Sequence, residues 1–244
     1  MHPLVVSKIV ASVIAITDGS TVKLLASSQD HKRIYDGDKG PNTGGMGAYS
    51  PTPAITEEVE KEILQKVFLP VVKEFKELGH PFKGFLYAGI MMTKKGFRVL
   101  EFNTRLGDPE TQAILPRLEN DLLELILAAV GERLSEISLH WKDEDCVCVV
   151  IASEGYPEEF ETDKKIAGIM SARENPDIQV FHAGTKRVDG EFLTSGGRVL
   201  NVVGSGRGIF EALSKTYSAV EKIFFDNMVY RKDIGSRAAK VLKH

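Results

Sequence analysis

Glu101, Asn103 and Arg105 are the residues of this chain whose types and spacing first suggest chemistry. Side chains alternate between the two faces of a β-strand, so Glu101 and Asn103 would project side by side, about 7 Å apart at the backbone. Carboxylate and amide oxygens so placed can converge on one hard cation such as Mg²⁺. Arg105 adds a planar cation suited to phosphate or carboxylate. The pattern indicates nucleotide phosphate chemistry, and spacing alone leaves a solvated strand edge as the alternative.

The strand that carries this pair is predicted over residues 97–103, and a helix over residues 109–118 follows it. On strict alternation one face of the strand carries Phe97, Val99, Glu101 and Asn103. The apolar neighbours favour a buried strand, in which an acid such as Glu101 needs a partner. Asp108 is predicted to cap the helix, with Pro109 in its first turn. A second helix is predicted over residues 122–130, capped by Asp121 with Glu124.

Two other segments could bind an anion. Asp30-His31-Lys32-Arg33 is rich in charge, and Lys32 or Arg33 could bind an anionic substrate group; a solvated loop is the alternative. Residues 40–47 contain four glycines, and successive backbone N–H groups in such a loop can form an anion-binding nest. A mobile loop is the competing interpretation, since the sequence fits neither a Walker loop nor Gly-x-Gly-x-x-Gly.

The first part of the chain is predicted to build a sheet backed by one helix. The expected elements are a hairpin of strands 9–16 and 21–25, a helix over 56–78 kinked at Pro70, and a strand over 84–93. Because the chain starts almost directly in the first of these strands, residues 9–16 are expected to form an exposed apolar edge. Such an edge would favour self-association.

A boundary is predicted near residues 131–145, which divides the chain into domains 1–138 and 139–244. The second part is expected to be strand-rich with one long helix. Its predicted strands cover 146–152, 178–182, 190–193 and 198–203, and its helix covers 208–224. Arg198, between apolar neighbours, could contact a ligand or lie on a solvated face.

Composition limits the classes of function. The 244 residues are 43% hydrophobic and 27% charged with net charge −3, so no basic field for nucleic acid is expected. No apolar run reaches membrane-spanning length, and Met1-His2-Pro3-Leu4 lacks the features of a signal peptide. Cys146 and Cys148 are interpreted as buried thiols in a reducing compartment. We therefore expect a cytoplasmic protein that does not contact membranes.

Several motifs resemble one family when they are taken in chain order. They are Asp30-His-Lys-Arg33, Gly40 to Tyr49, Leu86-Tyr-Ala-Gly89, Glu101 to Glu110, Phe181-His-Ala-Gly-Thr185, Gly196-Gly-Arg-Val199 and Tyr230-Arg-Lys-Asp-Ile-Gly235. In this order they closely resemble the glycinamide ribonucleotide synthetases, or phosphoribosylamine–glycine ligases, which are ATP-grasp enzymes of purine synthesis. The resemblance covers nearly the whole chain from about residue 11. It implies an α+β fold: the C-terminal half of an ATP-grasp domain, an antiparallel sheet with helices, followed by a small strand-rich domain.

The resemblance also implies a reaction and its ligands. ATP would phosphorylate the carboxylate of glycine, and the amine of 5-phosphoribosylamine would attack the glycyl phosphate. The metal ligands, for Mg²⁺ or Mn²⁺, match Glu101 and Asn103, and Arg105 matches an arginine beside the transferred phosphate. The candidate catalytic residues are Arg105, Asp108 and Glu110; the last two could orient the substrate amine or Arg105, or serve as a helix cap and first-turn charge. The candidate substrate-binding residues are Lys32, Arg33, Asn42, Thr43, Gly44 and Gly45.

The chain departs from the family at its front, where an N-terminal domain and the lid of the ATP site are expected. Residues 1–8 do not resemble the family at that point. The alternative to an active ligase is therefore a non-catalytic fragment that needs the N-terminal half. A ligase for a different amine is a third interpretation, against which the loop 40–47 and the segment 230–235 argue. Members of the family are usually monomeric, and a fragment could self-associate.

Overall fold

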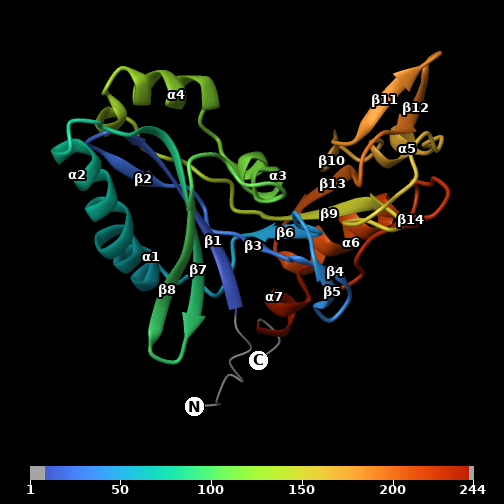
Figure 1. Cartoon of the computed structure of the whole chain (residues 1–244), viewed down its shortest axis with the longest axis horizontal. Coiled ribbons are helices and arrows are strands. Elements are labelled where there is room, and N and C mark those ends of the chain that lie inside the picture. Colours follow the sequence, from blue (N-terminus) through green and yellow to red (C-terminus); the bar gives the residue numbers. More distant parts are fainter. Residues whose placement is uncertain (1–8, 242–244) are drawn as a thin grey trace. The chain divides into compact units, whose positions relative to one another are not determined.

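The computed structural model describes residues 9–241 and divides into two compact units whose segments alternate along the chain (Figure 1). The first unit contains the described residues up to Gln29, together with Pro51–Gly107 and Leu118–Lys142. The second contains Asp30–Ser50, Asp108–Arg117 and the chain from Asp143 onward. The predictions for residues 1–8 lie outside the described residues.

The first unit is built on a four-stranded antiparallel sheet in the order β2-β1-β7-β8. The strands are β1 (Ile9–Asp18), β2 (Val22–Leu24), β7 (Lys83–Thr93) and β8 (Gly96–Asn103). The predicted hairpin and the strands at 84–93 and 97–103 are confirmed. The prediction of an exposed edge at residues 9–16 is wrong, because β1 lies inside the sheet, between β2 and β7.

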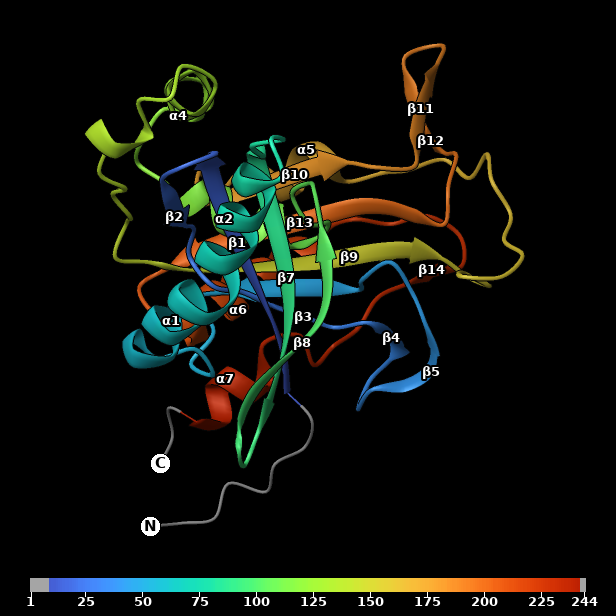
Figure 2. The same cartoon turned by 60° about the vertical axis from the view of Figure 1, so that its left-hand side comes forward.

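One face of this sheet is covered by a helical segment of three parts, α1 (Glu57–Ile63), a π-helical turn (Leu64–Phe68) and α2 (Leu69–Glu77), as Figure 2 shows. The π turn comes directly before Pro70, where the sequence predicted a kink. Proline has no N–H and its ring crowds the carbonyl four residues earlier, so a wider turn relieves the crowding. The helix buries a cluster against the sheet that includes Val13, Ala15, Ile63, Val67, Phe68, Leu86, Ala88 and Ile90.

The first unit also contains α4 (Leu122–Val130), whose predicted start is confirmed. The carboxylate of Asp121 accepts hydrogen bonds from the N–H groups of Leu123 and Glu124, 2.7 and 3.2 Å away, as an N-cap does. A short 3₁₀ turn, Leu134–Glu136, follows α4. Its Leu134 N–H donates to Asp18 Oδ2 over 3.2 Å, which joins the turn to the end of β1.

The second unit is built on a sheet whose strands differ in length. Their order is β10-β13-β9-β6-β3, with β14 paired to β9. Its strands are β3 (Gln29–Asp30), β6 (Gly47–Ser50), β9 (Asp145–Ser153), β10 (Ile178–His182), β13 (Arg198–Gly206) and β14 (Met228–Val229). α6 (Ile209–Val220) packs on the face that carries Val147, Val149 and Val202. α3 (Glu110–Ile114) packs on the other face, against Cys146 and Cys148. Both thiols are buried and free, as predicted.

Smaller elements complete the second unit. The sequence predicted the strand at 190–193 and placed the 3₁₀ turn within the helix expected over 109–118, but it did not predict the others. The smaller elements are the hairpin β4 (Arg33–Tyr35) and β5 (Lys39–Asn42), the hairpin β11 (Thr185–Val188) and β12 (Glu191–Thr194), α5 (Ile169–Ala172), α7 (Ser236–Val241) and a 3₁₀ turn at Leu115–Arg117. Short polar strands of this kind have too few apolar positions for a clear period-two pattern. Within residues 9–241 no helix combines the length and the apolar character needed to cross a bilayer.

Phe68→Ala should lower the free energy of unfolding of the first unit by about 3–5 kcal/mol, because it empties a fully buried position beside the sheet. Phe75→Ala is the matched control on the same helical segment. Since the Phe75 side chain is 40% exposed, its truncation should cost only about 1 kcal/mol. Urea denaturation of both variants measures the difference, and equal losses would contradict the packing described here.

Candidate functional site

A β-bulge in β8 decides which face of the sheet the candidate metal ligands occupy. Ile90 of β7 pairs with Val99, but the preceding residue, Gly89, pairs with Glu101. Leu100 is therefore the extra residue of the bulge. A bulge shifts the alternation of side chains by one position, so residues before and after it exchange faces.

Glu101 and Asn103 lie on one face, as predicted, but Phe97 does not share it. Phe97 packs into the core beneath the helices, whereas the pair with Glu101 lies on the face opposite them. Tyr87 is the cross-strand partner of Asn103, and its hydroxyl shares a 2.9 Å hydrogen bond with Ser12 Oγ on the same face. The prediction that Phe97 and Val99 share a face with Glu101 is wrong, because both precede the bulge and Val99 pairs with Ile90 on the helix-covered face.

The prediction of a buried strand at 97–103 is also wrong. β8 is an edge strand, and its Leu100 and Phe102 are 50% and 43% exposed. Glu101 is exposed, so it needs no buried partner. The segment was expected to be buried because its apolar residues look the same in sequence on an edge strand as on an interior strand.

The arrangement of Glu101 and Asn103 fits a hard cation. Their oxygens lie on one face, and neither side chain has a hydrogen bond or ion pair within the described part of the chain. A Cβ atom at Gly89 would lie 3.2 Å from Glu101 Cγ, so this glycine leaves the carboxylate its space. Among residues 9–241 no three His, Cys, Asp or Glu side chains gather into a metal cluster. A cation here would depend on one carboxylate, one amide and further ligands such as phosphate or water.

Arg105 lies just past β8 in the same unit and is exposed. Its Nη1 donates to the carbonyl of Leu106 over 3.1 Å, which is a local contact. The rest of the guanidinium can take an anion, as the sequence analysis suggested.

Lys32 and Arg33 are both exposed in the second unit, and each is held by a neighbour. Lys32 Nζ forms an ion pair with Asp30 Oδ2 at 2.5 Å. Arg33 Nη1 donates to the carbonyl of Gly40 over 2.6 Å, across the β4–β5 hairpin. The hairpin thus presents two cations with defined orientations, which loop composition alone could not show.

The glycine-rich loop does not form the predicted anion nest. The N–H groups of Thr43, Gly44, Gly45 and Met46 donate, respectively, to Lys32 O, Tyr156 Oη, Thr43 Oγ1 and His31 O over 2.7–2.9 Å. These donors are therefore already used within the unit. The anion-nest interpretation fails at residues 43–46 because three of these N–H groups donate to residues outside the loop and the fourth to Thr43 within it.

Two of the loop glycines are closely approached by other residues. A Cβ at Gly44 would lie 2.9 Å from Arg198 Cζ, and one at Gly45 would lie 2.4 Å from Pro109 Cδ and 2.8 Å from Asp30 Oδ1. Gly45 also has φ of +124°, in the region that favours glycine. Arg198 and Asp30 thus lie directly against the loop backbone.

Asp108 and Glu110 occupy different environments. The N-cap position of α3 is Pro109, and no side chain caps the helix, so the predicted cap at Asp108 is wrong. Its carboxylate instead accepts hydrogen bonds from Gln112 Nε2 at 3.1 Å and Arg198 Nη1 at 3.2 Å, and remains 49% exposed. Glu110 is 1% exposed. Of the two carboxylates, only that of Asp108 can be reached from solvent in this structure.

Buried Asp30 and His31 have shifted pKa values. Burial, together with the charge of Glu110, raises the pKa of Asp30 to about 7, although Lys32 acts in the opposite direction. Burial lowers the pKa of His31 to about 4, and the charge of Arg231 adds to the effect. Asp30 is therefore mostly the neutral acid below about pH 7, and His31 is mostly the neutral imidazole above about pH 4.

A buried arginine holds the β4–β5 hairpin. Arg231 is 1% exposed and forms ion pairs with Asp38 at 2.9 Å and Asp233 at 2.7 Å. It also donates to the carbonyl of Arg33 over 3.0 Å, and Asp38 receives a second ion pair from Arg237. In the sequence the segment 230–235 served only as a family motif. The opposite charges of Arg231 and Asp233, two residues apart, are the signal that could have drawn attention to this network.

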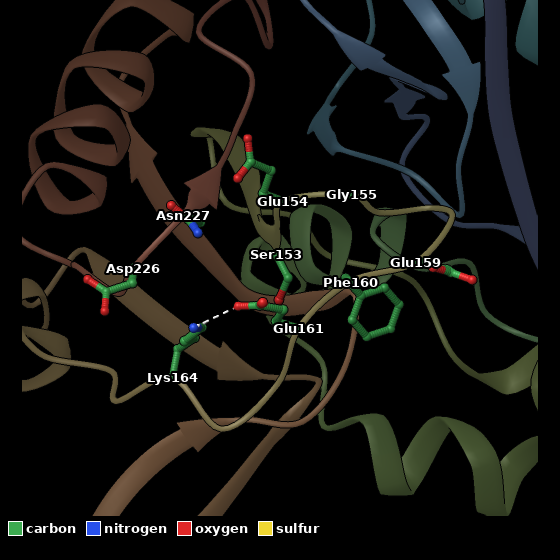
Figure 3. A pocket seen from close by; sticks show the side chains of 9 residues that line it. All are labelled: Ser153, Glu154, Gly155, Glu159, Phe160, Glu161, Lys164, Asp226 and Asn227. Atoms are coloured by element: carbon green, nitrogen blue, oxygen red, sulfur yellow. Dashed lines mark ion pairs between the residues drawn. The ribbon is translucent and has the colours of Figure 1, made fainter.

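A cavity of about 460 Å³ lies elsewhere in the second unit and contains none of the candidate residues (Figure 3). Four of its nine lining residues are acidic, and one of them, Glu161, forms an ion pair with Lys164 at 2.7 Å. This cavity is therefore separate from the candidate residues.

The fold of this chain is that of ATP-grasp enzymes. The biotin carboxylase domain of Hydrogenobacter thermophilus 2-oxoglutarate carboxylase, solved with MgADP, is similar with a TM-score of 0.62. It is 17% identical and covers 91% of this chain and 47% of its own, which supports the fold alone.

Two family models match the sequence: the phosphoribosylglycinamide synthetase ATP-grasp (A) domain over residues 5–111 and the C domain over residues 146–237. The chain belongs to the phosphoribosylglycinamide synthetase family. The crystal structure of phosphoribosylamine–glycine ligase from Thermotoga maritima is 33% identical, with a TM-score of 0.82 over 93% of this chain and 56% of that one.

Curated relatives carry the same name. Phosphoribosylamine–glycine ligases of Rhodopirellula baltica and Caldanaerobacter subterraneus are 49% and 46% identical over 228 and 226 residues, each covering 93% of this chain. The chain spans about half the length of these relatives, 52% and 54% respectively. The family resemblance inferred from the motifs is confirmed, and so is the mixed helix and antiparallel-sheet fold.

Gly45→Ala should destabilise the second unit more than Gly190→Ala. Both glycines have positive φ, so each substitution should cost about 1–2 kcal/mol for the backbone. Only at Gly45 does the new methyl group meet Pro109 and Asp30, which should add about 1–3 kcal/mol, because nothing lies within 4 Å at Gly190. Chemical denaturation measures both, and equal costs would contradict the close packing of the loop.

Asp30 and His31 should give opposite pH dependences of stability. Between about pH 4 and pH 6.5 the folded state holds a proton on Asp30 that the unfolded state lacks, and lacks one on His31 that the unfolded state holds. The two contributions, each about 1.4 kcal/mol per pH unit, oppose each other. Relative to wild type, stability should rise with pH in Asp30→Asn and fall with pH in His31→Gln.

Urea denaturation at several pH values in this window measures these slopes. Comparison with wild type removes the contribution of the other titrating groups. Parallel pH profiles for all three proteins would contradict the shifted pKa values.

Proposed function

We propose that this chain takes part in the ATP-dependent joining of glycine to 5-phosphoribosylamine. In this reaction a carboxylate oxygen of glycine attacks the γ-phosphorus of ATP and ADP leaves. The amine nitrogen of 5-phosphoribosylamine then attacks the glycyl carbonyl carbon, phosphate leaves and the amine loses a proton. The products are glycinamide ribonucleotide, ADP and phosphate. The family membership and the shared name of the relatives support the proposal.

The position of Glu101 and Asn103 together on the sheet face opposite α1 and α2 of the first unit is the observation that carries the proposal. These residues would hold Mg²⁺ or Mn²⁺, which when bound neutralises phosphate charge. Arg105, exposed and lacking a carboxylate partner within the described residues, would bind the phosphoryl oxygens. Fixed positive charge at the transferred phosphate is what phosphoryl transfer requires of a protein.

The second unit would bind the small-molecule substrates. Lys32 and Arg33 would contact their anionic groups. The segment Asn42, Thr43, Gly44 and Gly45 would contribute shape and carbonyl groups, since its Thr43–Gly45 N–H groups are engaged. We assign the contact with a substrate amine to Asp108, because its carboxylate is 49% exposed. Glu110 is buried, and its charge raises the pKa of Asp30. It would therefore act indirectly, through the surroundings of the Asp108 carboxylate.

We further propose that the chain works in the cytoplasm. Residues 1–138 and 139–244 would correspond to the ATP-grasp and C-terminal parts of the ligase. The two short segments 30–50 and 108–117 pack in the second unit and lie in the first part by sequence.

Calorimetric titration of the purified chain with Mg²⁺ and ATP tests the metal and phosphate assignment. Glu101→Ala should weaken binding at least about tenfold, or roughly 1.4 kcal/mol, because it removes the only carboxylate of the pair. Glu74→Ala, which removes an exposed acid from α2, is the matched control and should bind as wild type does.

Equal affinity in Glu101→Ala and wild type would contradict the assignment. Absence of binding to wild type would contradict the proposal that this chain by itself holds the metal and phosphates. Turnover with glycine and 5-phosphoribosylamine, followed as ADP release, tests the reaction itself.

A further inference from the structure

Arg198 connects two candidate segments of the second unit through one nitrogen atom. Its Nη1 lies 3.2 Å from the carbonyl oxygen of Gly44 and 3.5 Å from that of Gly45. The same nitrogen lies 3.0 Å from the carbonyl oxygen of Asp108 and 3.2 Å from its Oδ1. Arg198 begins β13, so the sheet provides a fixed base for these contacts.

The surroundings of Arg198 fit a holding role better than a ligand-binding one. The side chain is 23% exposed, and its guanidinium carbon lies so close to Gly44 that a methyl group there would be only 2.9 Å away. Gly44 is also held from its N–H, which donates to Tyr156 Oη over 2.9 Å. The carbonyl and the N–H group of Gly44 therefore both have side-chain partners, Arg198 of β13 and Tyr156 of the loop after β9.

The contact with Asp108 fixes the direction of its carboxylate. Oδ1 receives hydrogen bonds from Arg198 and from Gln112, so rotation of the carboxylate would break both. Oδ2 has no hydrogen bond within residues 9–241, and the side chain is 49% exposed. A carboxylate held at one oxygen and exposed at the other is oriented to accept a proton or a hydrogen bond from a bound amine.

We infer that Arg198 is a positioning residue that sets the Asp108 carboxylate at a fixed place relative to the Gly44–Gly45 turn. It acts through these groups and does not itself contact substrate. The inference rests on the proposed function, because Asp108 and the loop matter to the reaction only if they bind its substrates. Misplacement by about 1 Å of a reacting or orienting group can cost about 100-fold in rate.

Three variants of the full chain test this inference: Arg198→Met, Arg198→Lys and, as the control, Arg207→Met. Met keeps much of the side-chain volume and removes the donors. Lys places one nitrogen with three N–H donors at this position. Since all four contacts use a single nitrogen of Arg198, Lys should restore part of these hydrogen bonds. Arg207 is exposed in the same unit and makes no side-chain contact with the loop or Asp108.

Amide hydrogen exchange is the first measurement, and it requires no activity. Arg198→Met should speed exchange at least tenfold in segments 40–47 and 105–112 together, with a smaller change in Arg198→Lys and none in Arg207→Met. Unchanged exchange in these two segments would overturn the inference whether or not the chain is a ligase.

Steady-state kinetics is the second measurement. Arg198→Met should lower kcat/KM for 5-phosphoribosylamine roughly 10- to 100-fold and leave KM for ATP unchanged, with partial rescue in Arg198→Lys. A uniform loss that follows only thermal stability, or wild-type kinetics in Arg198→Met, would overturn the positioning role. A wild-type chain without turnover would refute the proposed function of the isolated chain, and the exchange data would then decide the inference alone.

Discussion

The close approach of side chains to the backbone at Gly44 and Gly45 is the constraint on which the candidate site of the second unit depends. A guanidinium lies against one glycine and a carboxylate against the next, at distances that leave no room for a Cβ atom. The same close packing buries Asp30, which raises its pKa, and brings Arg198 within hydrogen-bond distance of the Gly44 carbonyl. The loop is rigidly specified by this contact, and the glycines are required by their neighbours more than by flexibility.

Local sequence patterns predicted the elements that carry the site but not the details that orient it. The strands at 84–93 and 97–103, the helix that starts at Thr56 and the Asp121 cap follow from periodicity and capping residues, which act over a few positions. The bulge at Leu100 depends on how β8 pairs with β7, and no residue within β8 marks it. Asp108 looks like a helix cap until Arg198, 90 residues later in the chain, takes its carboxylate.

The same distinction applies to the charged residues. Glu101 and Asn103 were identified because they lie two residues apart on one strand. The bulge precedes both residues, so they still share a face. The Arg231 network was missed as a network because its acids come from residues 38 and 233 and its carbonyl partner from residue 33. The sequence likewise did not show that the N–H group of Gly44 is already hydrogen-bonded, since its partner Tyr156 lies far away in the chain.

The alternation of the two units along the chain has a consequence for dissection of the protein. The chain passes from one unit to the other several times, so neither unit is a continuous piece of sequence. A polypeptide that began at Asp143 would keep β9 and β13 but lack β6, which pairs with β9, and α3, which covers Cys146 and Cys148. Its sheet would have a bare edge and an uncovered apolar face, and both are sites of aggregation. The second unit is thus a folding unit only together with residues 30–50 and 108–117.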